Sequence, residues 1–186
     1  MVAATSIAEI FVANRELFVP FAAEQVSVSA LLSWLVGAAA IAFVSSDTPW
    51  VSWQSFGPGW IPHTVLGIVF LCIVTGAGFA IELLVETSIT LGWLGTVGVF
   101  WIGLAITNRP ETAWAPAMVA LAANLMLDFQ LGPRTAGFEV YRWFDSDLRS
   151  SWVVAVPMLL ALTGLMAMAA RFPSRQTHLN GGAPVR

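Results

Sequence analysis

The segment Val65–Val85 reads VLGIVFLCIVTGAGFAIELLV and contains a single charged residue, Glu82. A helix of this length rises about 1.5 Å per residue and crosses the hydrocarbon core of a bilayer, which is about 30 Å thick. Four other apolar stretches are separated from it by polar joints. The shortest of these covers residues 113–128. The sequence therefore predicts an all-α, polytopic integral membrane protein of four to five transmembrane helices with interfacial amphipathic segments. The predicted spans cover about residues 26–45, 64–85, 89–107, 113–128 and 151–170.

Composition favours a membrane protein and excludes several soluble classes. Of the 186 residues, 58% are hydrophobic and 10% are charged, whereas soluble domains are about 25% charged. The net charge is −3 and the basic residues form no cluster, which excludes nucleic acid as a partner. Cys72 is the only cysteine, which excludes an internal disulfide and a thiolate metal cluster. We therefore expect one membrane domain over residues 26–170, surrounded by lipid.

The first 25 residues lack the basic-then-apolar order of a cleavable signal peptide, so we expect them to be retained. Their apolar residues recur at helical spacing while Glu9 falls elsewhere on the wheel, which predicts an amphipathic interfacial helix. Such a helix lies along the headgroups or packs on a partner subunit; a partly ordered terminus is the alternative. The apolar positions are Ile7, Ile10, Phe11, Leu17 and Phe18.

A second amphipathic stretch, Phe138–Leu148, precedes the last predicted span and is expected to lie on the membrane surface. After that span, residues 171–186 are rich in Gly, Pro, Ser and Asn, which predicts a disordered polar tail. The two amphipathic stretches are the surfaces that we expect to contact a partner.

The nine tryptophans divide into two groups by position. Trp34, Trp93 and Trp101 lie inside predicted spans, so we expect them to pack against neighbouring helices or lipid. Most of the others lie near span ends, where indole rings sit between lipid and water. The predicted interfacial anchors are Trp50, Trp53, Trp60, Trp114, Trp143 and Trp152.

Small residues line the predicted hairpin of the second and third spans. In a bilayer, helices associate by close backbone approach, which small residues permit. Since glycine is also common in membrane helices regardless of role, a purely compositional origin is the interpretation that we favour. The candidate contact positions are Gly76, Gly78, Ala80, Gly92, Gly95 and Gly98.

His63 is the one histidine near a predicted span, because His178 lies in the tail. Gly59 and Gly67 flank it at four residues on either side and would leave room for a flat macrocycle, so His63 is a candidate pigment ligand. A polar cap at the start of the second span is the simpler interpretation. We predict no cofactor; bound lipid, quinone or pigment is the alternative.

Two polar pairs lie near span ends, each with its members one helical turn apart: Glu82 with Glu86, and Asn124 with Asp128. Ionisable groups inside a bilayer are costly, about 2.5–3.5 kcal/mol for Asp at mid-depth, and often mark ion or proton paths. Close to the headgroups the same groups can reach water and act as anchors, which is the interpretation that we favour. The pairs nevertheless form the candidate intramembrane polar site.

No constellation of catalytic residues is present. Ser, His and acidic residues are not grouped as in a hydrolase, and a phosphate-binding loop ending in Lys is impossible because the chain has no Lys. We predict no catalytic residues, no metal ligands and no enzymatic activity.

The loop Gly57-Pro58-Gly59-Trp60-Ile61-Pro62 precedes the second span. It resembles the Gly-Pro-Gly-aromatic-apolar-Pro signature of the small membrane subunit of tripartite tricarboxylate transporters, and the similarity covers about Val26–Ile106. The resemblance implies a non-catalytic subunit that accompanies a large transport subunit and a periplasmic solute-binding protein in carboxylate uptake. It also implies a location in the bacterial inner (cytoplasmic) membrane. The long Gly132–Ser150 element departs from that family's compact ending.

Three functions follow, in order of preference. The first is a small, non-catalytic membrane subunit that packs against a larger membrane partner in solute transport, most readily of carboxylates. The second is an accessory subunit of a respiratory or photosynthetic membrane complex that holds lipid, quinone or pigment. The third is a self-contained channel or ligand-binding membrane protein, which would require Glu82, Asn124 and Asp128 to converge on an internal cavity.

Overall fold

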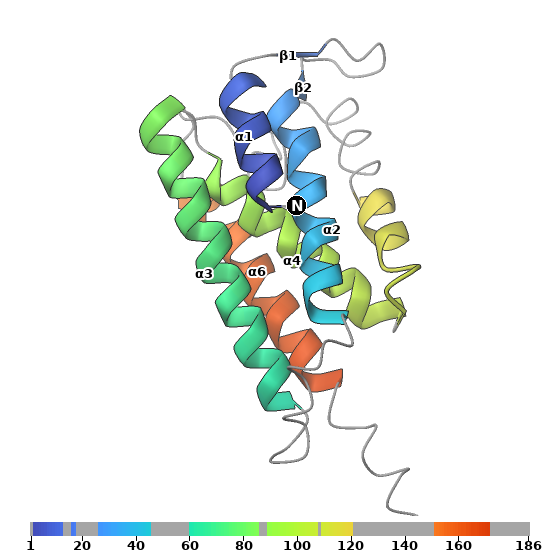
Figure 1. Ribbon diagram of the computed structural model, residues 1–186. Coiled ribbons are helices and arrows are strands. Elements are labelled where there is room, and N and C mark those ends of the chain that lie inside the picture. The colour runs from blue at the N-terminus through green and yellow to red at the C-terminus, as the bar shows by residue number, and fades with distance from the viewer. Residues whose placement is uncertain are drawn as a thin grey trace, which may run out of the picture.

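The computed structural model (Figure 1) describes residues 2–12, 16–17, 26–45, 60–85, 89–107, 109–120 and 151–171. Over these residues the predicted all-α class is confirmed, apart from one pair of very short strands. Residues 114–120 are also helical. The longer helices are α1 (Val2–Val12), α2 (Val28–Ser45), α3 (Trp60–Val85), α4 (Thr90–Thr107) and α6 (Ser151–Arg171).

The two strands lie between α1 and α2. β1 (Glu16–Leu17) pairs antiparallel with β2 (Val26–Ser27), so that Leu17 lies opposite Val26. The N-terminal helix was expected to continue through Leu17, and this expectation is wrong: α1 ends at Val12, and Leu17 is extended because it pairs with Val26. Phe18 lies outside the described residues.

Two of the helices are long and apolar enough to cross a membrane. These segments are His63–Leu84 in α3, with 22 residues, and Thr90–Thr107 in α4, with 18 residues. The other apolar helical segments are shorter, at Val2–Phe11, Leu32–Val44 and Val154–Ala170. Pro62 lies in the first turn of α3, where its missing N–H removes no helical hydrogen bond.

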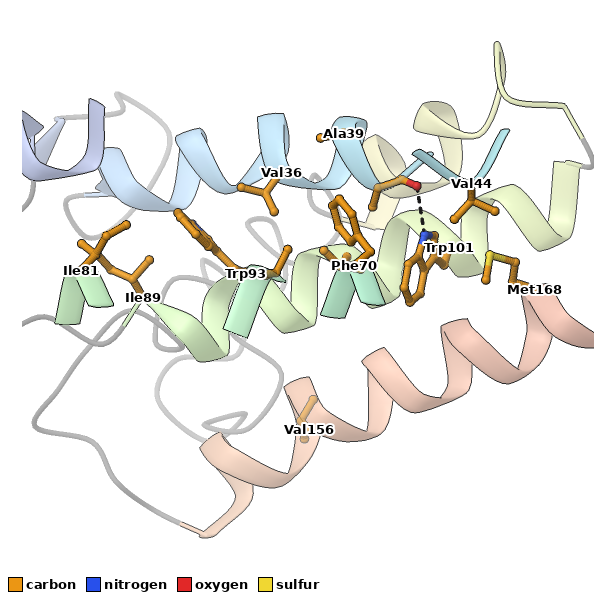
Figure 2. Close-up of a cluster of buried hydrophobic side chains, with 13 residues drawn as sticks. Val36, Ala39, Val44, Phe70, Ile81, Ile89, Trp93, Trp101, Val156 and Met168 are labelled. Carbon is orange, nitrogen blue, oxygen red and sulfur yellow. Dashed lines mark hydrogen bonds between the residues drawn. The ribbon is translucent and has the colours of Figure 1, made fainter. Parts of the chain in front are cut away.

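α4 is the central helix of the bundle. It packs against α2, α3 and α6, and α1 lies on α2 and α3 (Figure 1). Trp93 and Trp101 of α4 are fully buried, which confirms that they pack inside the bundle. The Trp101 indole N–H donates to the carbonyl of Ala40 on α2 at 3.3 Å, beside Phe70 of α3 (Figure 2).

Two glycines let α4 and α6 touch through their backbones. A Cβ at Gly98 would overlap the backbone of Leu160 on α6, and a Cβ at Gly164 would lie 2.7 Å from the Gly98 carbonyl oxygen. Gly98 was a candidate position for the contact between the second and third spans, and the helix that it approaches this closely is α6. Within the α3–α4 hairpin, Gly78 has the corresponding role, since its Cβ would lie 3.0 Å from the Thr90 Cα. A Cβ at Gly76 would meet nothing within 4 Å.

Large apolar side chains cover much of the outside of α1, α3 and α6. Phe11 is 75% exposed, and Leu83 and Leu84 are each 72% exposed. On α6 the exposed set includes Met158, Leu159, Leu162 and Met166. Meanwhile several polar side chains are buried inside the bundle, so its polarity is partly inverted relative to a water-soluble protein.

Candidate functional site

Among the described residues, the buried polar side chains other than His63 gather at one end of the bundle. They come from α1, from the first half of α2 and from α4. Together with the fully buried Trp93, which offers an indole N–H, we call this group the Glu9 cluster. Its members are Thr5, Glu9, Ser29, Ser33, Trp93 and Thr96.

α1 supplies the acid because it turns its polar side inward. Thr5 and Glu9 are one helical turn apart and are 2% and 0% exposed, whereas Ile7 and Ile10 on the same helix are 59% and 45% exposed. The predicted amphipathic pattern is therefore present in Val2–Val12, with the apolar side on the outside of the bundle. In water this orientation would be unfavourable, but it suits a helix whose outer face meets lipid or another protein.

Glu9 is held beside the start of α2 and the first turn of α4. Burial raises the pKa of its carboxyl above the ordinary 4.5, while the neighbouring Ser29 hydroxyl and Trp93 indole act in the opposite direction and lower the pKa. Burial has the larger effect. Among the described residues, neither carboxyl oxygen of Glu9 forms a well-aligned hydrogen bond, and the same holds for the Trp93 indole nitrogen.

One turn further along, the cluster continues as hydroxyls. The Thr96 hydroxyl donates to the Gly92 carbonyl at 2.8 Å, and its oxygen lies 3.1 Å from the Ser33 hydroxyl oxygen. Because α1 runs antiparallel to α2 (Figure 1), Thr5 extends the cluster in the same direction from Glu9 as Ser33 does from Ser29. The cluster thus has the titratable carboxyl of Glu9 near the end of the bundle, and the neutral hydroxyls of Thr5, Ser33 and Thr96 one helical turn further in.

Glu82 lies at the end of α3 and closes the turn into α4. Its Oε1 accepts hydrogen bonds from the backbone N–H groups of Ile89 and Thr90, both at 2.7 Å. These are N–H groups at the start of a helix, which lack partners within the helix, and a carboxylate there also suits the helix dipole. Within the described residues Glu82 therefore serves the hairpin. The other residues predicted with it, Glu86, Asn124 and Asp128, lie outside the described part of the chain.

His63 is buried in the first turns of α3. The space beside Gly67, one turn along, is filled by α6: a Cβ at Gly67 would lie 2.5 Å from Leu165 Cδ1 and 3.0 Å from Met168 Cε. Gly59, the other predicted neighbour, lies outside the described residues. His63 and the Glu9 cluster lie toward opposite ends of the bundle, because the start of α3 is opposite the start of α4 (Figure 1).

The predicted tryptophan anchors are only partly covered by the structure. Trp114 is 55% exposed at the start of the short helix 114–120. Trp60 and Trp152 lie in the first turns of α3 and α6, with their side chains outside the described set. Trp50, Trp53 and Trp143 lie outside the described residues altogether.

Sequence reasoning missed the Glu9 cluster. The signal was the four-residue spacing of Thr5 and Glu9 on the side of the helix opposite Ile7, combined with Ser29 and Ser33 at the same spacing in the next helix. In the described part of the chain, no group of three or more His, Cys, Asp or Glu side chains could hold a metal ion. What the cluster offers chemically is one protonatable carboxyl among neutral hydrogen-bonding groups.

Comparison with known proteins adds no assignment to this geometry. A scan against protein-family models and searches of curated proteins and of solved structures found no match to the chain.

Proposed function

We propose that this chain is a small, non-enzymatic integral membrane subunit that assembles with a larger membrane partner in carboxylate uptake. The observation that carries the proposal is the inverted polarity of the bundle. Exposed large apolar side chains cover α1, α3 and α6, while a carboxyl and several hydroxyls are buried. Soluble monomers seldom expose apolar patches beyond a few hundred Å². An environment of lipid or of a membrane partner accommodates both the exposed apolar side chains and the buried polar ones.

In this proposal, α2, α3, α4 and α6 cross the membrane and residues 113–128 supply a fifth span. α1, with 11 residues, is about 16 Å long and stays at the interface. The exposed residues of α3 fit this placement, because they extend from Val65 near its start to Leu84 near its end. The proposed location is the bacterial inner membrane.

The outer face of α3 offers a surface for a transmembrane helix of the partner. Cys72, Gly76 and Ala80 are all exposed and recur every four residues, which places them in one stripe along the helix. Small residues at this spacing allow the backbone of another helix to approach closely. The bundle uses the same device internally, where Gly98 and Gly164 bring α4 and α6 together.

The carboxylate substrate class is supported by the loop that leads into α3. The Gly57–Pro62 sequence resembles the signature of small subunits of tripartite tricarboxylate transporters, and α3 begins at Trp60, within that signature. The restricted backbone of Pro62 suits the first turn of a helix. The signature therefore coincides with the start of the most exposed long helix.

Purification in mild detergent followed by mass spectrometry tests the assembly. We expect the full-length chain to stay with membranes in alkaline carbonate and to co-purify with a larger membrane protein in fixed stoichiometry. Gly76→Leu should abolish co-purification without unfolding the bundle, because Gly76 is exposed and a Cβ there would meet nothing within 4 Å. Ala42→Leu, at an exposed position of α2, is the matched control and should retain the partner.

Three outcomes would contradict the proposal. Release of the chain by carbonate would remove the membrane assignment, and purification as a lone homo-oligomer would favour a self-contained channel. Unchanged uptake of labelled citrate in cells lacking the chain would remove the transport role. Co-purification with electron-transfer proteins would favour the accessory subunit of a respiratory or photosynthetic complex.

A further inference from the structure

The buried carboxyl of Glu9 has no use in the assembly described above. It is 0% exposed, and no described residue forms a well-aligned hydrogen bond to either of its oxygens. The adjacent Trp93 indole N–H, also buried, is likewise unbonded among these residues. An ionised carboxylate without a compensating partner is unfavourable in such a place, so burial favours the neutral form of the group.

The helices packed around Glu9 supply no compensating positive charge. α2, over Val28–Ser45, and α4, over Thr90–Thr107, contain no charged residue. α3 contributes His63, Cys72 and Glu82 as its titratable groups; Glu82 is bonded to the start of α4, and His63 lies toward the other end of the bundle. The groups that do face Glu9 are the Ser29 hydroxyl and the Trp93 indole, both neutral.

We propose that Glu9 is a proton-binding site and that proton uptake there is coupled to docking of α1 on α2 and α3. Docked α1 presents Ile7 and Phe11 outward, at 59% and 75% exposure, and buries Glu9 completely. Undocking would return the carboxyl to water and allow it to ionise. Protonation of Glu9 therefore shifts the equilibrium of α1 toward the docked state.

The sign of the pH dependence follows from the direction of the pKa shift. Because burial raises the pKa of docked Glu9 above 4.5, the docked state binds the proton more tightly than the undocked state does. Docking is strongest below the ordinary pKa and weakens as the pH rises from there through the raised pKa. Within that window, the docking equilibrium changes by up to about tenfold for each pH unit.

Thiol accessibility in the full-length, detergent-solubilised chain tests this coupling. With Cys72→Ser as background, Thr5→Cys places a thiol on the buried side of α1, and Phe11→Cys places one on the exposed side as a control for the intrinsic pH dependence of the thiol. The ratio of maleimide labelling rates, position 5 over position 11, should rise with pH. In the Glu9→Gln variant the ratio should stay low and flat, since glutamine cannot ionise.

Infrared spectroscopy of the unsubstituted chain provides a readout that does not depend on cysteine variants. We expect a protonated-carboxyl carbonyl band that persists above the ordinary pKa of a glutamate carboxyl, that titrates away as the pH rises further, and that is missing from Glu9→Gln. Absence of this band, or a labelling ratio with the same pH dependence in Glu9→Gln, would overturn the inference. A ratio that responds to sodium against choline chloride, but not to pH, would overturn it in favour of a cation. Proton binding at Glu9 requires no partner subunit, so these outcomes are separate from those that test assembly and transport.

Discussion

α3 and α4 are consecutive apolar helices of one hairpin, yet they occupy opposite environments. In α4, 56% of the apolar segment is buried, against 28% in α3. α4 is enclosed by α2, α3 and α6, and it holds the buried Trp93 and Trp101. α3 is covered on one side only and presents Phe79 and Leu83 outward, at 59% and 72% exposure.

Overall apolarity therefore does not separate a core helix from a peripheral one when both can lie in a membrane. In lipid, an outward-facing leucine is as well placed as an inward-facing one, so the hydrophobic effect does not select the face. Packing must select it. Buried indoles need enclosing neighbours and contact glycines need an approaching backbone. α4 provides both, whereas Gly76 on the exposed face of α3 has no neighbour within 4 Å of a Cβ placed there.

The largest expected effect comes from filling the glycine contact of the core helix. Gly98→Leu places a side chain against the backbone of Leu160 and 2.5 Å from the Ala161 nitrogen. Overpacking costs typically about 1–3 kcal/mol, and a backbone obstacle cannot move aside as a side chain can, so we expect a loss of at least about 3 kcal/mol. Unfolding in sodium dodecyl sulfate, followed by near-ultraviolet circular dichroism, measures this.

The same substitution on the peripheral helix is the control. A Cβ at position 76 would meet nothing within 4 Å, so Gly76→Leu should change the free energy of unfolding by less than about 0.5 kcal/mol. Equal losses for the two leucine variants would show that α3 and α4 do not differ in environment as described.

Aromatic truncation gives the next largest effect. Trp101→Ala empties a fully buried site and removes the N–H that bonds Ala40, whereas Phe79→Ala removes a ring that is 59% exposed. Core tryptophan truncation costs about 3–5 kcal/mol in soluble proteins. If the chain lies in a membrane as proposed, the separated helix also lies in an apolar medium, so we expect a smaller cost of about 2–3 kcal/mol. Phe79→Ala should cost less than about 0.5 kcal/mol in the same assay; a cost equal to that of Trp101→Ala would contradict the contrast.

The all-α class was accessible from the sequence because it depends on continuous apolar stretches between polar joints. Trp93 and Trp101 were expected to pack against neighbouring helices or lipid, and their position in an apolar segment did not decide between these two environments. The helix that contacts Gly98 could not be predicted, because the sequence shows a small residue without showing which helix approaches it. The end of α1 at Val12 depends on the pairing of Leu17 with Val26, a contact that helical periodicity cannot reveal.

The polar residues of the site could be predicted from the sequence only in part. Glu82 stood out as a charge near the end of an apolar segment, but its partners are backbone N–H groups of Ile89 and Thr90, which depend on the geometry of the turn. Glu9 was placed only on the polar side of an amphipathic interfacial helix, and such a helix is usually interpreted with its polar side toward water. Which side of α1 faces the bundle follows from tertiary packing with Ser29 and Trp93, not from periodicity.

The smallest expected effect comes from the turn between α3 and α4, which Glu82 closes. Glu82→Ala removes the acceptor for the Ile89 and Thr90 N–H groups and should cost about 1 kcal/mol, the usual loss for a helix cap. Glu82→Gln keeps a carbonyl oxygen at the same position and should retain part of the stability, so the difference between the two variants isolates the contribution of the charge to the helix dipole. Because the cap fixes the start of α4, the alanine variant should also increase amide hydrogen exchange at Ile89 and Thr90 more than in the middle of α4. If hydrogen exchange instead increases uniformly along α4, Glu82 stabilises the bundle as a whole and does not act as a cap. The difference in burial between α3 and α4 would then not depend on the hydrogen bonds that close the turn between them.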